Sequence, residues 1–239
     1  NIHAFREIKI NAQQVSIGGG TTLSDILHVP AMAEAAPSLF GAARVFGGKM
    51  VRNRATVAGN ICSGSPAADT VPPLLSLDAT ICLTNTEGCR TVSLDQFYTG
   101  FKTNLRRRDE LITGISWLVP SSNTANLFYK LARRKGDAIT VVGVAVTVTR
   151  EGNRCTHARI ALGSVGPTVF RAKDAEAVLA GGTVSEKLIN DAAQKAMEQS
   201  KPIDDLRASA NYRRHSVRVL TRRLITRAWH SLPEKTAYT

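Results

Sequence analysis

The sequence predicts an α+β fold, and three patterns in its second half lead to this prediction. Residues 139–149 are rich in valine and interrupted only by Gly143, which favours a buried strand. Glu151-Gly152-Asn153 is typical of a hairpin turn, and residues 155–164 would form the returning strand. Farther along, apolar residues recur with the 3.6-residue period of a helix, at positions 188, 189, 192, 193, 196 and 197. We therefore expect a small antiparallel sheet followed by helices.

The first part of the chain predicts two helices. Thr22 is a candidate N-cap for a short helix that ends near His28, because Asp25 stands three positions after it. Pro30 opens an alanine-rich stretch that we expect to be helical to about Val45.

Strands are expected toward the middle of the chain. Pro72-Pro73 precedes a strand-like run over residues 79–83, and a turn is expected at residues 85–88. Residues 111–119 alternate as a strand whose apolar face would consist of Leu111, Ile115, Trp117 and Val119. Residues 121–123 form a polar break, so we place the boundary between two domains, 1–120 and 121–239, at this point.

Three helices are expected to complete the second half. One would begin within residues 169–171. The sequence Thr183-Val184-Ser185-Glu186 has the form of a capping box that opens the helix noted above, and Pro202 follows its end. The last helix begins near Tyr212, and its apolar stripe consists of Val217, Leu220, Leu224 and Ala228.

The chain is strongly basic, with a formal net charge of +12 over 239 residues. The segment 211–232 contains no acidic residue and has arginines at positions 213, 214, 218, 222, 223 and 227. A solvated helix face, an acidic partner, an anionic ligand or nucleic acid would each explain this charge. We do not expect nucleic acid, because no aromatic stacking pattern accompanies the arginines.

Cysteine use and hydropathy exclude several classes of protein. The four cysteines form no CxxC pair, which argues against a zinc site or an iron–sulfur cluster held within this chain; they are Cys62, Cys82, Cys89 and Cys155. No apolar run is long enough to span a bilayer, and residues 1–30 show no secretory pattern. We therefore expect neither a metal site nor a membrane association, and a cytoplasmic location.

Residues 49–69 are the first place to expect a binding site. They show no helix or strand period and are rich in Gly, Ser, Thr and Asn. A loop of this length in a globular chain is usually functional or disordered, and the hydrophobic residues at both of its ends argue against disorder. Small residues allow a ligand to approach the backbone, successive amides bind anions, and Asp69 is suited to sugar hydroxyls. A tight crossing between packed elements explains the same composition, and local chemistry alone favours that second interpretation.

Four stretches of the chain resemble one family in the same order. VRNRATVAGNICSGSPAADTVPPLLSLDATICL resembles the second flavin-binding loop of the molybdenum hydroxylase flavoproteins, which include xanthine and carbon monoxide dehydrogenases. DELITGISWLVP, FYKLARRKGDAITVVGVAV and LRASANYRRHSVRVLTRRLITRA resemble later stretches of the same subunit. The resemblance implies a vanillyl-alcohol-oxidase-type FAD-binding domain, represented by its second subdomain, and a C-terminal α+β domain.

The resemblance also implies a set of FAD-binding residues. The loop residues expected at the diphosphate and ribose are Ala55, Thr56, Gly59, Asn60, Cys62 and Ser63, with Asp69 near the end of the loop. Those expected beside the rings of the cofactor are Phe46, Gly47, Leu111 and Ile112. Lys130 matches a lysine near the isoalloxazine edge, where a cation would stabilise the anionic reduced flavin. No residue is expected to act as a general base.

Two departures from the family pattern bear on FAD binding. Ala58 stands where the family usually has the first of two paired glycines. The family's N-terminal subdomain, which has its own Gly-rich diphosphate loop, is expected to be missing, because Gly18-Gly19-Gly20 matches the start of the second subdomain. Either a separate chain supplies that subdomain, or FAD binding has been lost.

The expected function is electron transfer. Electrons from a molybdenum cofactor on a molybdopterin-binding large subunit would pass through 2Fe–2S clusters of an iron–sulfur small subunit to FAD on this chain, and then to an acceptor such as NAD. The alternative is a non-catalytic scaffold subunit of such a complex that has lost FAD binding.

Overall fold

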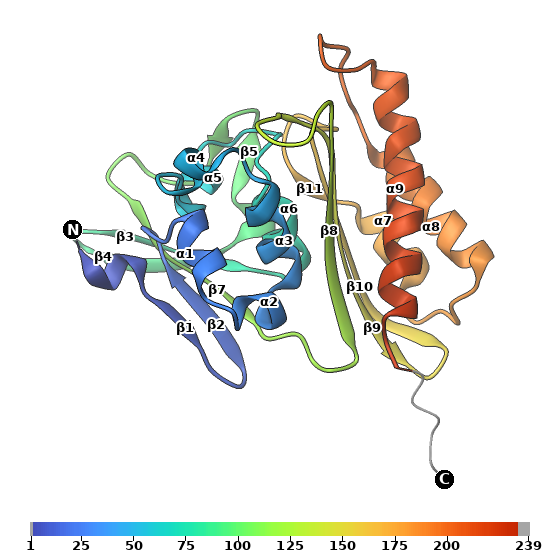
Figure 1. The fold of residues 1–239 in the computed structure, drawn as a ribbon, viewed down its shortest axis with the longest axis horizontal. Coiled ribbons are helices and arrows are strands. Elements are labelled where there is room, and N and C mark those ends of the chain that lie inside the picture. Colours follow the sequence, from blue (N-terminus) through green and yellow to red (C-terminus); the bar gives the residue numbers. More distant parts are fainter. Residues whose placement is uncertain (1, 234–239) are drawn as a thin grey trace.

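The computed structural model describes residues 2–233 and arranges them in four layers (Figure 1). A first sheet is followed by a group of short helices, then by a second sheet, and finally by three helices on the outer face of that second sheet. The helices of the first half therefore lie between the two sheets. The α+β class that we expected is confirmed.

The first sheet has the strand order β1-β2-β7-β3-β4, and every neighbouring pair is antiparallel. Its strands are β1 (Ile8–Ile10), β2 (Gln14–Gly18), β3 (Thr80–Asn85), β4 (Gly88–Ser93) and β7 (Leu111–Leu118). The turn expected at residues 85–88 joins β3 to β4. A second hairpin, β5 (Tyr98–Gly100) with β6 (Thr103–Asn104), lies outside this sheet and follows the short helix η2 (Leu94–Gln96).

The predicted apolar face of β7 was wrong at its first residue. Cys82 pairs with Gly114 but Leu83 pairs with Ile112, so Thr113 forms a bulge. A bulge reverses the in-and-out alternation of the strand. Ile112 is therefore buried together with Ile115, whereas the side chain of Leu111 is 63% exposed.

The first predicted helix is confirmed, and the second is interrupted. α1 (Leu23–His28) begins with a complete capping box between Thr22 and Asp25. The expected helix to Val45 consists of α2 (Met32–Ala35) and α3 (Pro37–Val45). The helix breaks at Ala36, whose φ is −154°. Ala36 precedes Pro37, and a residue before proline is disfavoured in the helical region.

The segment from 49 to 69, which we expected to be irregular, contains two short helices. They are α4 (Lys49–Arg52) and α5 (Val57–Cys62), and α6 (Val71–Ser76) follows. Helices of one or two turns are too short to show a period in the sequence. A short 3₁₀ segment, η1 (His3–Arg6), precedes β1.

The second sheet has the order β11-β10-β9-β8 and is antiparallel throughout. Its strands are β8 (Thr124–Ala132), β9 (Thr140–Glu151), β10 (Arg154–Gly163) and β11 (Phe170–Arg171). The two predicted strands and the hairpin between them are confirmed. Residues 169–171 do not begin a helix, because Phe170 pairs with Leu162 at the sheet edge, and the helix starts at Lys173.

Three helices cover the outer face of the second sheet: α7 (Lys173–Leu179), α8 (Glu186–Gln199) and α9 (Ala210–His230). The predicted cap of α8 was two residues too early. The Ser185 side chain, not that of Thr183, accepts the hydrogen bond from the Leu188 amide. Ser185 is followed directly by the first helical residue, which is where a cap must stand.

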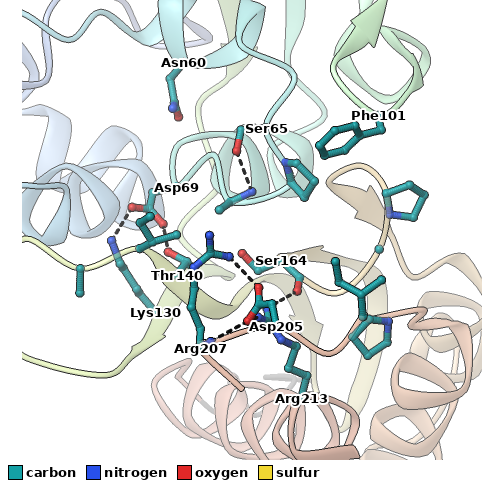
Figure 2. A pocket seen from close by; sticks show the side chains of 18 of the residues that line it. Asn60, Ser65, Asp69, Phe101, Lys130, Thr140, Ser164, Asp205, Arg207 and Arg213 are labelled. Carbon is teal, nitrogen blue, oxygen red and sulfur yellow. Dashed lines mark hydrogen bonds and ion pairs between the residues drawn. The ribbon is translucent and has the colours of Figure 1, made fainter. Parts of the chain in front are cut away.

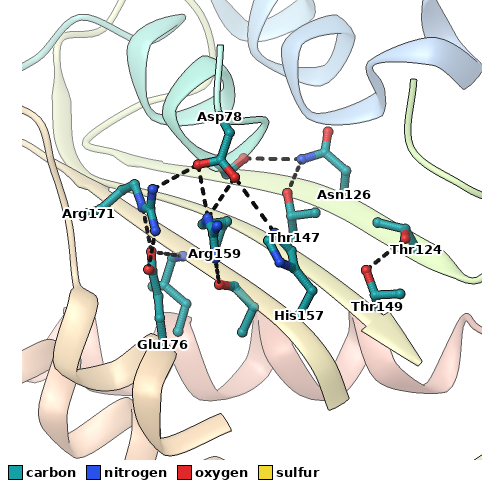
Figure 3. A network of polar contacts seen from close by, with 12 residues as sticks. Asp78, Thr124, Asn126, Thr147, Thr149, His157, Arg159, Arg171 and Glu176 are labelled. Atoms are coloured by element: carbon teal, nitrogen blue, oxygen red, sulfur yellow. Dashed lines mark hydrogen bonds and ion pairs between the residues drawn. The ribbon is translucent and has the colours of Figure 1, made fainter. Parts of the chain in front are cut away.

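Polar contacts tie the first half of the chain to the second sheet (Figure 3). Asn126 of β8 donates to the hydroxyls of Ser76 and Thr147, at 3.1 and 2.7 Å, and accepts from the Ser38 amide at 3.0 Å. After α6, Asp78 forms ion pairs with Arg159 at 2.7 Å and Arg171 at 2.8 Å. The predicted boundary near residue 121 lies in the link between β7 and β8, and it stays a prediction.

Candidate functional site

A cavity of about 1070 Å³ opens where the first half of the chain meets the second sheet (Figure 2). Its walls come from the loop between α5 and α6, the ends of β8 and β9, and the segment that precedes α9. Five of the predicted FAD-binding residues border it: Phe46, Gly47, Asn60, Asp69 and Lys130. The structure thus brings together residues that lie more than 80 positions apart in the sequence.

Asp69 and Lys130 form a buried ion pair in the wall of this cavity. The Lys130 Nζ lies 2.6 Å from Asp69 Oδ2, and each side chain is only 7% exposed. Thr140 donates its hydroxyl to the other oxygen of Asp69. Burial raises the pKa of the Asp69 carboxyl, and the charge of Lys130 opposes that rise. The lysine that resembles the family's flavin-edge cation is therefore already balanced by a carboxylate.

Asn60 offers a hydrogen-bond donor to the cavity. Its side-chain oxygen accepts from the amide of Thr70 at 3.1 Å and from the hydroxyl of Thr70 at 2.7 Å. Among residues 2–233, none accepts a hydrogen bond from the Asn60 amide nitrogen. That nitrogen is free to donate to a ligand carbonyl or phosphate oxygen.

The other predicted loop residues lie along α5, from the residue before its N-cap to its C-cap, and do not line the cavity. Thr56 caps α5 by accepting from the Gly59 amide at 2.9 Å, and a Cβ at Gly59 would lie 2.8 Å from the Thr56 hydroxyl. Ser63 donates to the Asn60 carbonyl at 2.7 Å. Burial raises the pKa of the Cys62 thiol, although the charge of Arg106 opposes that rise, and burial therefore disfavours the thiolate form.

The turn at residues 18–22 lies directly against this loop. Thr22 forms a β-bridge with Thr56, and the Leu23 amide donates to the Ala55 carbonyl at 3.0 Å. Gly19 is needed there, because a Cβ would stand 2.0 Å from the Ile112 carbonyl oxygen. Ala55, Thr56 and Ile112 are thus gathered around this turn. Leu111 does not line the cavity.

The substitution at position 58 does not obstruct the loop. The Ala58 side chain is 6% exposed and belongs to the apolar core that contains Val57 and Ile61. Its methyl group packs inward.

Two residues at the floor of the cavity were missed at the sequence level. Arg213 is buried and donates to the carbonyls of Val141 and Ser164, both at 2.9 Å, and to Asp205 at 2.7 Å. The Arg213 Nε and the Ser164 hydroxyl are buried without a hydrogen-bond partner. Arg213 stands one turn before Val217, in line with the apolar stripe of the last helix. An arginine on the buried face of a helix is a signal that could have identified this residue. Ser164 had no such indication.

Each half of the chain matches a known protein family. Residues 1–122 match the family described as the FAD binding domain in molybdopterin dehydrogenase. Residues 127–228 match the CO dehydrogenase flavoprotein C-terminal domain. The two matches occur in the order that the sequence resemblance implies.

Two individual relatives align with more than nine-tenths of this chain. The carbon monoxide dehydrogenase medium chain of Hydrogenophaga pseudoflava is 31% identical over 95% of this chain and 79% of its own length. The glyceraldehyde dehydrogenase medium chain of Sulfolobus acidocaldarius is 33% identical, with coverages of 92% and 78%.

Solved structures superimpose over almost the whole chain. A carbon monoxide dehydrogenase structure from Hydrogenophaga pseudoflava matches with a TM-score of 0.93 and 31% identity, covering 97% of this chain and 80% of that one. Quinoline 2-oxidoreductase from Pseudomonas putida matches with a TM-score of 0.88 and 28% identity, with the same coverages. The chain belongs to the FAD-binding medium subunits of molybdenum hydroxylases, and it is a component of an oxidoreductase.

Proposed function

We propose that this chain holds FAD between its two halves and relays electrons within a molybdenum hydroxylase. The electrons would come from the molybdenum cofactor of a molybdopterin-binding large subunit through the 2Fe–2S clusters of an iron–sulfur small subunit. They would leave to an acceptor such as NAD. When bound, FAD supplies the two-electron chemistry, and the chain supplies its position and electrostatic surroundings.

The cavity at the second sheet is the observation that supports this proposal. Its volume of about 1070 Å³ lies just above the roughly 300–1,000 Å³ common for cofactor sites. The Ser164 hydroxyl and the Arg213 Nε are buried there without partners, which normally costs about 1–3 kcal/mol for each group. Both atoms are shielded from solvent, so a bound ligand would reach them only after local side-chain movement. The free amide nitrogen of Asn60 and the cations of the lining fit the oxygens of a flavin.

The residues of the wall would fix the charge balance of the site. The paired Asp69 and Lys130 add no net charge. The other charged residues of the lining are four cations, Lys102, Lys201, Arg207 and Arg213, and two carboxylates, Asp137 and Asp205, so the lining keeps an excess of positive charge. Positive side chains near a cofactor that gains electrons favour its reduced state. Phe46 and Gly47 would contact the ring system, and Asn60 would donate to a cofactor oxygen.

The second group of predicted residues would bind the rest of the dinucleotide. We assign the diphosphate and ribose to Ala55, Thr56, Gly59, Cys62 and Ser63, beside the turn at residues 18–22. Leu111 and Ile112 stay predicted contacts of the rings. A separate chain with a further diphosphate loop, the two-domain boundary near residue 121 and a cytoplasmic location also stay predictions.

One observation favours the alternative of a scaffold that has lost FAD. The carboxylate and the lysine in the cavity wall already satisfy each other, so this pair needs no ligand. The two interpretations differ in flavin content.

Flavin quantification on the purified complex tests the proposal. FAD released by denaturation would be measured per copy of this chain, together with the iron and molybdenum of the complex. About one FAD per chain is the expected result. A complex that retains its clusters and molybdenum but contains no flavin would contradict the proposal and leave the scaffold role.

A further inference from the structure

The outer face of α9 presents five arginines to solvent. We call this set the α9 arginine face; it consists of Arg214, Arg218, Arg222, Arg223 and Arg227. The surrounding segment 211–232 contains no acidic residue. Figure 1 shows α9 on the side of the second sheet away from the first half of the chain. None of the five arginines lines the cavity, although Arg213 of the same helix does.

These arginines have no carboxylate partner among residues 2–233. Several arginines elsewhere on the molecule are paired, such as Arg6 with Asp25, Arg90 with Glu110 and Arg171 with Glu176. Others, such as Arg44 and Arg54, form no ion pair among residues 2–233. The exception on α9 is Arg213, which turns inward to Asp205. Arg214 has one weak contact, with the Asn211 side chain at 3.3 Å. Because it has no carboxylate partner among the described residues, the α9 arginine face carries a positive charge that nothing nearby compensates.

The spacing of the arginines makes this charge unfavourable for the isolated chain. Arg214, Arg218 and Arg222 follow one another at four-residue intervals, about 6 Å along the axis. Arg223 and Arg227 repeat that interval. Like charges four residues apart on a helix repel each other, and the helix dipole offsets this only in the last turn. A surface of opposite charge would relieve the repulsion.

A groove of about 670 Å³ lies at one end of the arginine face, between the start of α8 and the end of α9. Arg222, Arg223 and Arg227 line it, together with His230. Glu186 is the one carboxylate among its lining residues, and it forms no ion pair with the arginines. The groove therefore has a basic wall suited to carboxylate side chains.

The aromatic residue in the groove is not placed to stack on a nucleobase. Trp229 is only 7% exposed, and the Arg150 guanidinium lies 4.6 Å from the centre of its ring. Sequence-independent binding of single strands depends on free aromatic surfaces. The site is thus better suited to acidic side chains of a protein than to bases.

We propose that the α9 arginine face docks an acidic surface of a partner subunit, whose carboxylates pair with the arginines and enter the groove. Arginine forms bidentate pairs with carboxylates and is well suited to such an interface. The docking rests on the proposed role of this chain as a subunit of a heteromeric complex.

Charge reversal within the complex tests the docking. The variant Arg218→Glu/Arg222→Glu would be co-expressed with the partner subunits, and dissociation of this chain would be followed by mass photometry on dilution at several salt concentrations. We expect the Kd of the variant to be at least about tenfold higher than that of the unchanged complex. The Kd of the unchanged complex should rise steeply with salt.

Two further variants separate docking from folding. Arg107→Glu/Arg108→Glu changes the net charge equally on an exposed loop before β7, and we expect it to leave the Kd within about twofold. Arg218→Gln/Arg222→Gln keeps good helix formers and should weaken docking less than charge reversal. Circular dichroism of each purified variant checks that α9 remains folded.

The outcomes distinguish this inference from the function proposed above. An unchanged Kd and salt dependence in the charge-reversed complex would overturn the docking, even if FAD is present. Loss of FAD with normal assembly would overturn the proposed function alone. If assembly is normal but the variant loses binding to a short duplex DNA or to phosphatidylglycerol vesicles, the face serves one of those anions and the docking proposal is wrong.

Discussion

The unpartnered hydroxyl of Ser164 gives a sharp test of where FAD binds. Ser164→Ala removes only that hydroxyl, and we expect FAD affinity to fall by about tenfold, the equivalent of one hydrogen bond. Stability without the cofactor should not fall, because an unsatisfied buried hydroxyl contributes nothing favourable. Fluorescence titration of the deflavinated complex with FAD measures the change.

Thr221 provides the matched control. Its hydroxyl is also buried and unpartnered, but it lies on α9 and does not line the cavity. Thr221→Val should leave FAD affinity unchanged. Equal losses in the two variants would show that the effect is a general one on the fold.

The low pKa of Glu110 predicts that the free energy of unfolding falls at acid pH. A hydrogen bond from Arg90, and then one from the Arg107 amide, lower the pKa of Glu110 to about 2. Its contribution to stability is present above the unfolded-state pKa of about 4.3 and is lost as pH falls toward about 2. Urea unfolding of the chain and of Glu110→Gln should therefore give stabilities that converge within this window. Parallel curves would show that Glu110 does not titrate as described.

At the scale of single residues, composition pointed to the segment 49–69 as a candidate site, but only the resemblance named the residues outside that segment. Periodicity and turn composition describe neighbours along the chain, so they cannot show that Asn60, Asp69 and Lys130 meet at one cavity. The pairing of Asp69 with Lys130 was not expected, because each residue was assigned to the cofactor separately. Ser164 stands at the end of a strand, where a serine has no distinctive pattern.

At the scale of elements, the cap of α8 is open to test. Ser185→Ala removes the side chain that accepts from the Leu188 amide, and we expect it to cost about 1 kcal/mol of unfolding free energy. Thr183→Ala should cost little, because Thr183 lies before the helix and its side chain does not cap it. Thermal unfolding of both variants checks this order, and the reverse order would support the cap expected from the sequence.

Element length explains which parts of the fold the sequence predicted. The long strands over residues 140–151 and 154–163 and the helix after Ser185 contain enough residues for a period to show. The four-residue α4, the six-residue α5 and the two-residue β11 do not. The face of β7 was misassigned at Leu111, because a bulge depends on the partner strand rather than on the strand itself.

At the scale of the whole molecule, the second sheet joins the two halves. Ala145 and Ala161 on one face of the sheet pack into the core of the first half, while Val144 and Val146 on the other face pack under α7–α9. β9 is consequently buried on both faces.

This packing predicts that the halves do not fold well alone. Residues 121–239 expressed separately should expose the face that contains Ala145 and Ala161, bind a hydrophobic dye and aggregate. Co-expression with residues 1–120 should restore a soluble pair. A soluble, cooperatively unfolding fragment 121–239 would show that the halves are independent, and size-exclusion chromatography with calorimetry distinguishes the two results.

The place of α3 and α6 between the sheets also has a consequence for synthesis. These helices leave the ribosome before the strands they pack against, since α6 ends at Ser76 and β9 begins at Thr140. At about 5–20 residues per second, the delay is on the order of several seconds. During that interval the apolar surfaces that face the second sheet are uncovered. The nascent chain is then a substrate for chaperones, and slower translation through residues 77–139 would lengthen that exposure.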